Sequence, residues 1–540
     1  TALPPLRAYT INLAGSLAGV AGFALASWFE APPSTWFLVA FAAAAPLLRN
    51  RRWTAGALAG VLCLAISGVL VFAMQRGTLW SPYYKITVKS LGQETVVEVN
   101  NIWHQSMAPV DSKEYFYQWP YMVFGDTFRD VLILGAGSGT DVAAALKHGV
   151  ASVDAVEIDP AILRLGKQNH PDRPYWDPRV HPVADDARHF LRTTEKKYDL
   201  VVFALIDSLT LQSAFSGVRL ESYMFTEESF RAVRRVLKPD GVLVVYNYFR
   251  EPWLVDRLAN TAAAAFGEEP MVHVHPAKDQ LGVMVVGPRL KTLAAYPEAP
   301  SEVTAFNQGA PLAPPVRHVR DRSIVPATDN WPFLYMREPH LPSHYTNALA
   351  VVLLVSVLSV FAVVRGAVRK WSWEFFFLGA GFMLLETKSI IQFALLWGST
   401  WVVASLTIAA VLVMALVANW TVAHVEIRRP RVVGAFLLAL LAFNYLVPVG
   451  TLAFDSRLVE SVVYSLLVFS PIFCAGLLFG SSIKRSDDVT VDYGANLLGA
   501  MVGGVAEYLS LLMGFQFLLL LVAAFYVAAL ATRKAMPAAA

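Results

Sequence analysis

Long apolar runs constrain this sequence more than any other feature. A helix needs about 20 mostly apolar residues to cross the hydrocarbon core of a bilayer. Runs near this length lie at residues 8–29, 34–48, 54–75, 346–364, 373–398, 400–424, 432–450, 459–481, 493–511 and 513–532. They predict ten membrane-spanning helices. Only 16% of all residues are charged, against roughly a quarter in soluble domains, which argues against a wholly water-soluble protein.

The segment between the apolar runs has a different character. In residues 76–343 charged residues return, Pro and Gly interrupt the chain, and short β-branched runs alternate with amphipathic helical stretches. The sequence therefore predicts three regions. Residues 1–75 hold three transmembrane helices and are interpreted as the remnant of a first membrane repeat, 76–343 form a soluble domain, and 344–540 hold seven transmembrane helices as a second repeat.

Two distant apolar stretches resemble each other in register. The pattern Tyr9-x-x-Asn12-Leu13-x-Gly15-x-x-x-Gly19 recurs as Tyr493-x-x-Asn496-Leu497-x-Gly499-x-x-x-Gly503. One alternative is chance use of the small-xxx-small pattern that lets membrane helices approach closely. We favour an internal duplication of the kind found in transporter-like membrane domains. It predicts further helices before Thr1 or an additional membrane chain.

Lys and Arg in the short loops predict the orientation. Basic clusters occur at 49–52, 365–370, 428–431, 484–485 and 533–534. With ten spans all five fall on one side, which the positive-inside rule assigns to the cytoplasm. The expected location is a bacterial inner (cytoplasmic) membrane, with several passes and the soluble domain on the extracytoplasmic side.

A glycine-rich turn is the strongest functional signal. The stretch from Val131 to Asp141 reads as a buried strand followed by Gly135, Gly137 and Gly139, and then a helix. Such a turn lets a ligand approach the backbone and offers free N–H groups at the helix start. A second strand ends at Glu157, where a carboxylate is placed to accept hydrogen bonds from ribose hydroxyls. Together these features predict a nucleoside-binding site.

The rest of the soluble segment fits the same type of fold. Asp185 and Asp186 precede a helix at the place where such folds contact adenine, and strands follow at 198–203 and 242–246. This is the layout of a class I S-adenosylmethionine-dependent domain. The predicted fold class is a polytopic α-helical membrane protein with an inserted α/β Rossmann-like domain, preceded by a small β-sheet.

Several motifs in order give a closer resemblance. They are Ser81-Pro82-Tyr83, Gln105, Glu114-x-x-Tyr117-Gln118, Glu157 and Asp186. Over about residues 81–290 the chain resembles the spermidine synthase (aminopropyltransferase) family, and as a whole it resembles membrane-fused bacterial members. The resemblance implies that Tyr83 lines the substrate pocket, Gln105 contacts the nucleoside, Glu157 binds ribose and Asp186 contacts adenine. The predicted nucleoside-binding residues are Gln105, Gly135, Gly137, Gly139, Asp141, Glu157, Asp185 and Asp186.

Two departures from the family pattern bear on the reaction. Ser138 stands where the family has an acidic residue in the glycine turn, and Ala204 stands where it has the base that deprotonates the amine. An alanine neither pairs with an ammonium group nor accepts a proton. We therefore expect intact S-adenosylmethionine to suit the pocket better than its decarboxylated form, without a metal. The predicted catalytic residues are Asp207 as base, with Tyr83 and Tyr117 as positioning groups; Asp207 is alternatively a turn former or helix cap.

Three ionisable residues fall inside apolar runs. Glu386 and Lys388 interrupt the run at 373–398, and Glu507 follows the second copy of the repeated motif. Such groups inside a membrane cost a few kcal/mol each and usually face a cavity or a partner. They predict either a polar binding site within the membrane or a structural pair between helices.

Three functions fit these observations. The first is a membrane-embedded S-adenosylmethionine-dependent transferase that moves a methyl, aminocarboxypropyl or aminopropyl group to a small-molecule or lipid acceptor. The second is a catalytically degenerate binding or scaffold subunit of a membrane complex, which Ala204 favours. The third is a transporter-like protein with a regulatory nucleoside-binding domain. A net charge of +3 on 540 residues gives no argument for a nucleic-acid partner.

Overall fold

The computed structural model forms two compact units. One comprises Thr1–Ala21 with Glu338–Ala540, and the other comprises Gly22–Arg337. The residues that the structure describes are 3–48, 55–92, 94–206, 222–276, 280–293, 303–304, 311–312, 315–364, 369–448, 452, 454 and 456–533.

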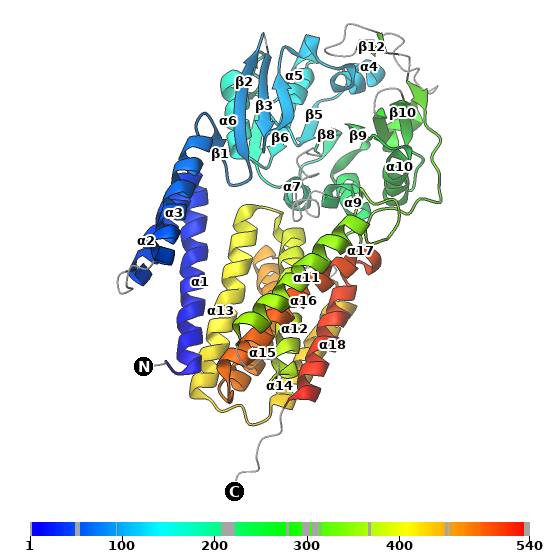
Figure 1. Cartoon of the computed structure of the whole chain (residues 1–540). Coiled ribbons are helices and arrows are strands. Elements are labelled where there is room, and N and C mark those ends of the chain that lie inside the picture. Colours follow the sequence, from blue (N-terminus) through cyan, green and yellow to red (C-terminus); the bar gives the residue numbers. More distant parts are fainter. Residues whose placement is uncertain are drawn as a thin grey trace. The chain divides into compact units, whose positions relative to one another are not determined.

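The second unit contains a small antiparallel sheet (Figure 1). Its strands are β1 (Leu79–Trp80), β2 (Lys85–Leu91), β3 (Glu94–Val99) and β4 (Ile102–Met107). Asn100 and Asn101 join β3 to β4 with positive φ angles of 52° and 67°, the backbone that a tight two-residue hairpin turn favours. One face of the sheet packs on helix α6 (Pro160–Asn169) through Ile86, Val97 and Val99. The predicted small sheet before the Rossmann-like fold is thereby confirmed.

The larger sheet has eight strands in the order β14-β10-β11-β9-β8-β5-β6-β7. Their bounds are β5 (Asp130–Leu134), β6 (Ser152–Glu157), β7 (Val180–Ala184), β8 (Tyr198–Ala204), β9 (Leu237–Tyr248), β10 (Met271–His275), β11 (Leu281–Val286) and β14 (Val316–Arg317). Strands β7, β6, β5, β8 and β9 are parallel, whereas β11, β10 and β14 add antiparallel pairs at one edge. The strand order reverses direction between β5 and β8. In open parallel sheets a ligand crevice lies at such a switch point, outside the carboxyl ends of the strands.

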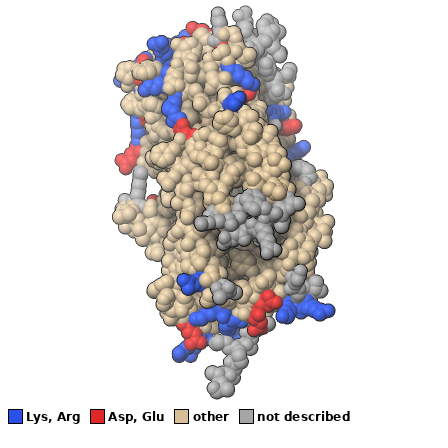
Figure 2. Space-filling model, turned by 60° about the vertical axis from the view of Figure 1, so that its left-hand side comes forward, with Lys and Arg blue, Asp and Glu red and all other residues tan. Residues whose placement is uncertain are grey.

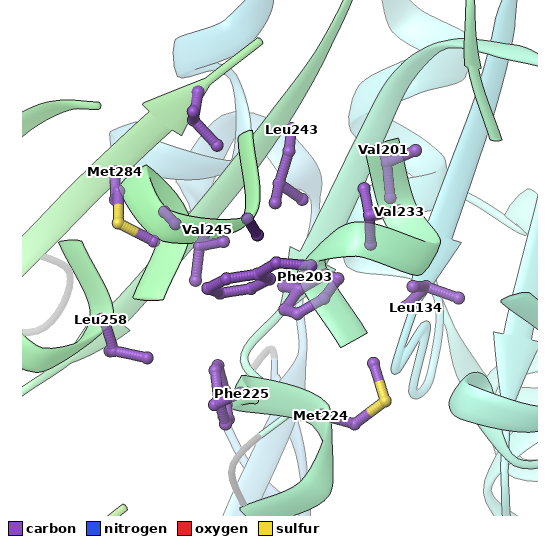
Figure 3. Packing of buried hydrophobic residues seen from close by; sticks show 14 of the residues in the cluster. Leu134, Val201, Phe203, Met224, Phe225, Val233, Leu243, Val245, Leu258 and Met284 are labelled. Atoms are coloured by element: carbon purple, nitrogen blue, oxygen red, sulfur yellow. The ribbon is translucent and has the colours of Figure 1, made fainter. Parts of the chain in front are cut away.

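Alternate residues of the central strands enter two cores, one on each face of the sheet. Leu134, Phe203 and Val245 lie in one core with side chains from α9 and α10 (Figure 3). Ile133 and Val202 lie in the other core with α5. Continuous apolar strands are expected where helices cover both faces of a parallel sheet. The helices and short strands of this unit are α2 (Pro33–Leu48), α3 (Ala55–Met74), η1 (Val110–Ser112), η2 (Tyr115–Tyr117), α4 (Trp119–Phe124), α5 (Thr140–Lys147), η3 (Pro174–Trp176), α7 (Ala187–Thr193), η5 (Ser222–Phe225), α9 (Glu227–Val236), α10 (Pro252–Phe266), η6 (Pro288–Thr292), β12 (Val303–Thr304) and β13 (Pro311–Leu312).

The buried Arg257 holds residues 325–337, the last segment of this unit, through hydrogen bonds to their carbonyl oxygens. Arg257 of α10 is 1% exposed. Its Nε donates to the carbonyl oxygen of Val325 at 3.0 Å, and its Nη2 donates to that of Arg337 at 2.8 Å. The guanidinium also lies 5.0 Å from the ring centroid of Trp331, a cation–π contact. Residues 325–337 are therefore part of the folded domain.

The first unit is a bundle of apolar helices. They are α1 (Pro5–Trp28, of which the first part belongs here), α11 (Ser343–Val363), α12 (Trp373–Trp397), α13 (Trp401–His424), α14 (Pro430–Leu446), α15 (Arg457–Ile483), α16 (Val489–Ala506), η7 (Glu507–Leu509), α17 (Ser510–Met513) and α18 (Phe517–Thr532). By length and composition, five described helices could cross a membrane: Pro5–Trp28, Tyr345–Val363, Trp401–His424, Leu458–Ile483 and Val489–Met513. Four shorter apolar helices accompany them, and the ten predicted spans stay a prediction. Outside the residues drawn in grey, Figure 2 shows a broad area with no Lys, Arg, Asp or Glu and charged side chains gathered along its lower edge.

Helices α12 and α16 approach each other closely in the described part of the bundle. A Cβ built on Gly499 would lie 1.9 Å from the carbonyl oxygen of Phe376, and one on Gly503 would lie 2.5 Å from that of Ala380. The two helices run parallel, because both partners advance by four residues. Asn496 Nδ2 donates to the carbonyl oxygen of Phe375 at 3.1 Å. The second copy of the repeated motif is thus a helix-packing face.

Candidate active site

The glycine turn lies at the switch point of the large sheet. It connects β5 to α5, and the backbone N–H groups of Gly135 and Ala136 both donate to the carbonyl oxygen of Val156 at 2.9 Å. The end of β8 lies beside it, since a Cβ on Gly135 would meet the carbonyl oxygen of Ala204 at 3.4 Å. Gly139 precedes α5 as its N-cap. The turn for which the sequence predicts nucleoside binding therefore lies at the switch point of the sheet.

Gln105 of β4 crosses from the small sheet to this turn. Its Oε1 accepts hydrogen bonds from the Ser138 backbone N–H and the Ser138 hydroxyl, both at 2.9 Å. A Cβ on Gly137 would lie 2.6 Å from that oxygen, and the φ of Gly137 is +55°, so another residue here would be strained and would displace the Gln105 amide. The backbone donor fixes the amide orientation, which leaves Nε2 as a buried donor without a partner among the described residues. A buried orphan donor beside a glycine turn fits a nucleoside ligand.

Glu157 ends β6 within reach of the same turn. Its Oε2 accepts from the Gly137 N–H at 2.9 Å, and its Oε1 accepts from the Asp159 N–H at 3.0 Å. Burial raises the pKa of the Glu157 carboxyl to about 7, and these hydrogen bonds oppose that shift. Each oxygen keeps a lone pair that can accept from a ribose hydroxyl.

Asp159 links the strand end to the Ser81-Pro82-Tyr83 motif. Its Oδ2 accepts from the Ser81 hydroxyl at 2.5 Å, while its Oδ1 caps α6 by accepting from the Ala161 N–H at 2.8 Å. The Ser81 hydroxyl oxygen in turn accepts from the Tyr83 N–H at 3.1 Å. The predicted positioning residue Tyr83 is therefore attached to the loop that carries Glu157.

Asp185 and Asp186 follow the neighbouring strand β7. The Asp185 N–H donates to the carbonyl oxygen of Glu157 at 3.1 Å, so the two predicted nucleoside residues lie on adjacent strand ends. Asp186 Oδ1 accepts from the His189 N–H at 2.9 Å and caps α7. The side chain of Asp185 faces His189, with Oδ2 at 2.8 Å from Nδ1.

A second group of predicted residues lies around η2. Tyr117 is half-buried, and its ring centroid lies 5.7 Å from that of Tyr246. Tyr246 is the cross-strand neighbour of Ala204. Burial raises the pKa of Asp141, in the first turn of α5, to about 8, and the Lys113 ammonium opposes this rise. Tyr117 therefore lies beside β9, and Asp141 lies within electrostatic range of Tyr117.

The predicted base Asp207 lies outside the described residues. The other predicted nucleoside and positioning residues, Tyr83, Gln105, Tyr117, Asp141, Glu157, Asp185, Asp186 and the three glycines, lie on loops and strand ends around the switch point. Among the described residues no cluster of His, Cys, Asp or Glu could hold a metal ion.

Part of the chain is similar to known proteins. Residues 113–275 match the spermine/spermidine synthase domain. Polyamine aminopropyltransferase 2 of Aquifex aeolicus is 25% identical over 217 residues, which cover 38% of this chain and 42% of the relative. The polyamine aminopropyltransferase of Pyrobaculum calidifontis is 30% identical over 198 residues, which cover 34% of this chain and 65% of the relative. The chain contains a spermidine synthase-like domain.

The similarity is limited to this domain. The chain spans less than half the length of the Aquifex aeolicus relative and less than two thirds of the Pyrobaculum calidifontis relative. The crystal structure of the spermidine synthase from Thermotoga maritima matches 39% of this chain and 72% of its own, with a TM-score of 0.31 and 18% identity.

The two departures from the family pattern, Ser138 and Ala204, are both buried in the spermidine synthase-like domain. Ser138 is 2% exposed, and its hydroxyl donates to Gln105 instead of placing a charge there. Ala204 is 6% exposed at the end of β8, next to Gly135 and Tyr246. The described site therefore has no carboxylate at either of these two positions.

The three ionisable residues predicted inside apolar runs belong to the helical unit. Lys388 is 7% exposed within α12, and Glu507 is 9% exposed in η7. Glu386 and Lys388 are two residues apart on one helix, where side chains do not face each other, and no ion pair joins these two described residues. The buried ion pair of the described bundle that involves α12 is instead Glu374 with Arg533 at 3.6 Å.

Sequence reasoning missed several residues that shape the site. The Tyr175 hydroxyl donates to the carbonyl oxygen of Gly137 at 2.7 Å and so holds the turn in place. Lys113 donates to Ser106 at 2.7 Å and lies in the electrostatic range of Asp141. Neither residue belongs to a motif, and each lies more than 25 residues from its partner in the turn or α5.

Proposed function

We propose that this protein is a membrane-embedded transferase that uses S-adenosylmethionine and acts on a small-molecule or lipid acceptor presented at the membrane. The observation that carries the proposal is the arrangement of Glu157, Gly137 and Gln105 at the switch point. A carboxylate on the turn backbone and an orphan amide donor face the same glycine. They supply an acceptor for ribose hydroxyls and a donor for the nucleoside.

The intact donor is favoured by charge. S-adenosylmethionine carries a carboxylate that its decarboxylated form lacks. A carboxylate at position 138 would repel it, whereas the Ser138 hydroxyl is neutral and already bound to Gln105. The curated relatives are named as aminopropyltransferases, so decarboxylated S-adenosylmethionine is the rival donor.

The transfer itself is a displacement at a sulfonium. A nucleophile of the acceptor forms a bond to the donor carbon, the carbon–sulfur bond breaks, and its electron pair stays on sulfur to give a neutral thioether. The acceptor's proton passes to a base, for which the sequence favours Asp207. Tyr83 and Tyr117 would orient the acceptor.

Ligand-dependent stabilisation of the detergent-purified full chain tests donor binding. A ligand that binds only the folded state at 100 times its Kd adds about 2.7 kcal/mol of stability. We expect S-adenosylmethionine to raise the Tm more than its decarboxylated form does. Glu157→Ala should abolish the shift, and the exposed Glu195→Ala should keep it. A larger shift with the decarboxylated donor would reverse the assignment of the donor.

The transferred group can be read from the position of an isotope. Native membranes that contain the protein are incubated with donor labelled either in the methyl group or in the carboxyl carbon. Incorporation of the first label alone indicates methyl transfer, and incorporation of the second indicates aminocarboxypropyl transfer. Label in neither, with donor binding intact, would refute a transferase that uses intact S-adenosylmethionine.

A binding or scaffold subunit is the second candidate, and Ala204 favours it. This residue is buried beside the glycine turn and supplies no base. If the protein binds donor but no label is incorporated, the pocket has a structural or sensing role; incorporation that Asp207→Asn leaves unchanged would only show that Asp207 is not the base. The transporter-like alternative would instead predict donor uptake into vesicles.

We also propose a multi-pass location in the bacterial inner membrane, with the domain on the extracytoplasmic side. The support is the set of basic loop clusters and the five helices of sufficient length. An external location requires that the donor be delivered across the membrane, since it is made in the cytoplasm. Cysteine labelling of Glu195→Cys with a membrane-impermeant reagent in intact cells tests the side: labelling supports the proposal, and protection until lysis contradicts it.

A further inference from the structure

Two polar side chains of α12 are buried without a partner in the described part of the helical unit. Lys388 is 7% exposed, and Gln392, one helical turn later, is 6% exposed. Neither side chain makes a hydrogen bond or an ion pair with another described residue. A buried charge or amide costs free energy unless it is paired, most of all in a helix among apolar helices. These two groups therefore require a partner that the described chain does not supply.

The face of α12 that carries Lys388 packs against α18. Glu374, Gly381 and Lys388 are spaced by seven residues and so lie close to one line along the helix. Glu374 pairs with Arg533, just after the end of α18, at 3.6 Å, and a Cβ on Gly381 would lie 2.9 Å from the ring of Tyr526. Their partners are also seven residues apart, in the opposite direction. The two helices are therefore antiparallel and in step along this face.

The same register brings Lys388 to an apolar part of α18. A further step of seven residues from Tyr526 places Leu519 opposite Lys388. Leu519 is 3% exposed, and its neighbours Leu518 and Val522 are fully buried. Helix α18 contains no Asp or Glu at all. This helix therefore offers no counter-charge to the ammonium group.

The helix on the other side of α12 is interrupted at the same level. In the parallel register of α12 and α16, Gly503 meets Ala380, so Lys388 is level with about Leu511. Here α16 passes through the 3₁₀ turn η7 into the short helix α17. Ser510, the first residue of α17, is 0% exposed, and its hydroxyl has no hydrogen-bond partner among the described residues. In transporter-like membrane domains, polar ligands bind where helices are discontinuous.

The carboxyl groups nearest in sequence or level do not neutralise Lys388. Glu386 lies two residues away on the same helix, where side chains do not face each other. Glu507 begins η7, about one helical turn before the level of Lys388. No ion pair joins either of these described carboxylates to Lys388. The counter-charge therefore has to come from outside the described chain.

We propose that Lys388, Gln392 and Ser510 form a binding site within the helical unit for the anionic group, a carboxylate or a phosphate, of a ligand. The ammonium group supplies the opposite charge, and the amide and the hydroxyl supply hydrogen-bond donors. A cationic ligand such as a polyamine is excluded, because the ammonium repels it. The phosphate of a lipid and the carboxylate of a soluble molecule such as S-adenosylmethionine share this chemistry, and the experiment separates the two sources. The site belongs to a different unit from the nucleoside pocket and does not depend on it.

Retention of an anionic lipid tests the first source. The full chain is reconstituted in vesicles of phosphatidylcholine and phosphatidylglycerol, extracted again, and its retained lipid is counted by native mass spectrometry. Lys388→Met removes the charge at similar volume and should reduce retained phosphatidylglycerol at least about tenfold. Lys388→Arg keeps the charge and should keep the lipid. The matched control is Lys370→Met, since the side chain of Lys370 is 68% exposed.

Binding of labelled S-adenosylmethionine tests the second source. The same variants are built on Glu157→Ala, which lacks the carboxylate proposed to bind ribose in the soluble domain. Residual binding to this chain should fall at least about tenfold with Lys388→Met and persist with Lys388→Arg. Methylthioadenosine should not compete for it, because this molecule has no carboxylate.

The two arms together decide the proposal. An anion that is retained in either arm, lost with Lys388→Met and kept with Lys388→Arg supports it and identifies the source. Equal retention by the unchanged chain and Lys388→Met in both arms overturns it, as does an equal loss with Lys370→Met. Because Lys388→Met could fail to fold, the unchanged chain is decisive by itself: if it retains no anion in either arm, the proposal is wrong.

Discussion

The protonation state of Glu157 gives a quantitative test of the nucleoside site. Burial raises the pKa of this carboxyl to about 7 in the ligand-free protein. The ionised form offers lone pairs on both oxygens to ribose hydroxyls, whereas the protonated form uses one oxygen as a donor. The nucleoside should therefore bind the ionised form and release a proton.

The size of the effect follows from the ionised fraction. With a pKa of about 7, roughly 9% of the sites are ionised at about pH 6 and roughly 91% at about pH 8, and the apparent Kd scales inversely with this fraction. The Kd should therefore fall about tenfold between these two pH values and level off above them. Methylthioadenosine is the right ligand, because it lacks the amino acid groups of S-adenosylmethionine that titrate in this range.

Isothermal titration of the purified chain at several pH values measures this dependence. Glu157→Gln should bind more weakly at every pH with a nearly flat profile, because its amide cannot accept from both the Gly137 and Asp159 N–H groups. The exposed Glu195→Ala should keep the wild-type profile. Binding that is detectable but independent of pH in the wild type, or a slope that survives in Glu157→Gln, would refute the reasoning.

Three further predictions concern stability. Arg257→Met leaves several buried carbonyl oxygens without donors and should lower the free energy of unfolding by about 3–5 kcal/mol in a denaturant titration. The control Arg322→Met, at an exposed arginine, should change it by under about 0.5 kcal/mol. Gly499→Ala should destabilise the detergent-purified bundle by about 1–3 kcal/mol because its Cβ meets a backbone oxygen, and Gly15→Ala should leave its Tm unchanged. Asp141 has a folded-state pKa of about 8 against an ordinary value of 3.8, so the folded state holds the extra proton between these values and loses stability as pH rises. Asp141→Asn should flatten the fall of Tm over that range, and an unchanged slope would contradict this assignment.

The α/β fold and the centre of the site could be predicted because their signals are local. The glycine turn and the acidic strand end at Glu157 are separated by about 20 residues, and the parallel order of the strands follows from alternating strands and helices. The hydrogen bond from Ser138 to Gln105 was out of reach, because it joins two different sheets. The role of Ser81 as an anchor on Asp159 depends on a contact across 78 residues.

The helical unit shows a different limit of sequence reasoning. Periodicity does not assign a face to a helix that is apolar all round. The repeated motif therefore predicted that Gly15 and Gly499 are related, but it did not predict that one is exposed and the other buried. Likewise, the pairing of Glu374 with Arg533 depends on which helix ends meet.

A residue near the C-terminal end of the spermidine synthase-like domain, Asp329, contacts the helix that follows the predicted adenine-binding residue Asp186. Asp186 caps α7, and two residues later Arg188 makes a two-pronged contact with Asp329, at 2.9 and 2.6 Å. Asp329 Oδ1 also accepts from the hydroxyl of Thr226 at 2.7 Å. Thr226 is the N-cap residue of α9. Because a two-pronged arginine–carboxylate pair holds its partner in one orientation, this partly buried ion pair holds together the short helix after β7 and the segment around Asp329. A change at Arg188 should therefore disturb the nucleoside site and this segment at once, whereas a flexible linker would have left the two independent.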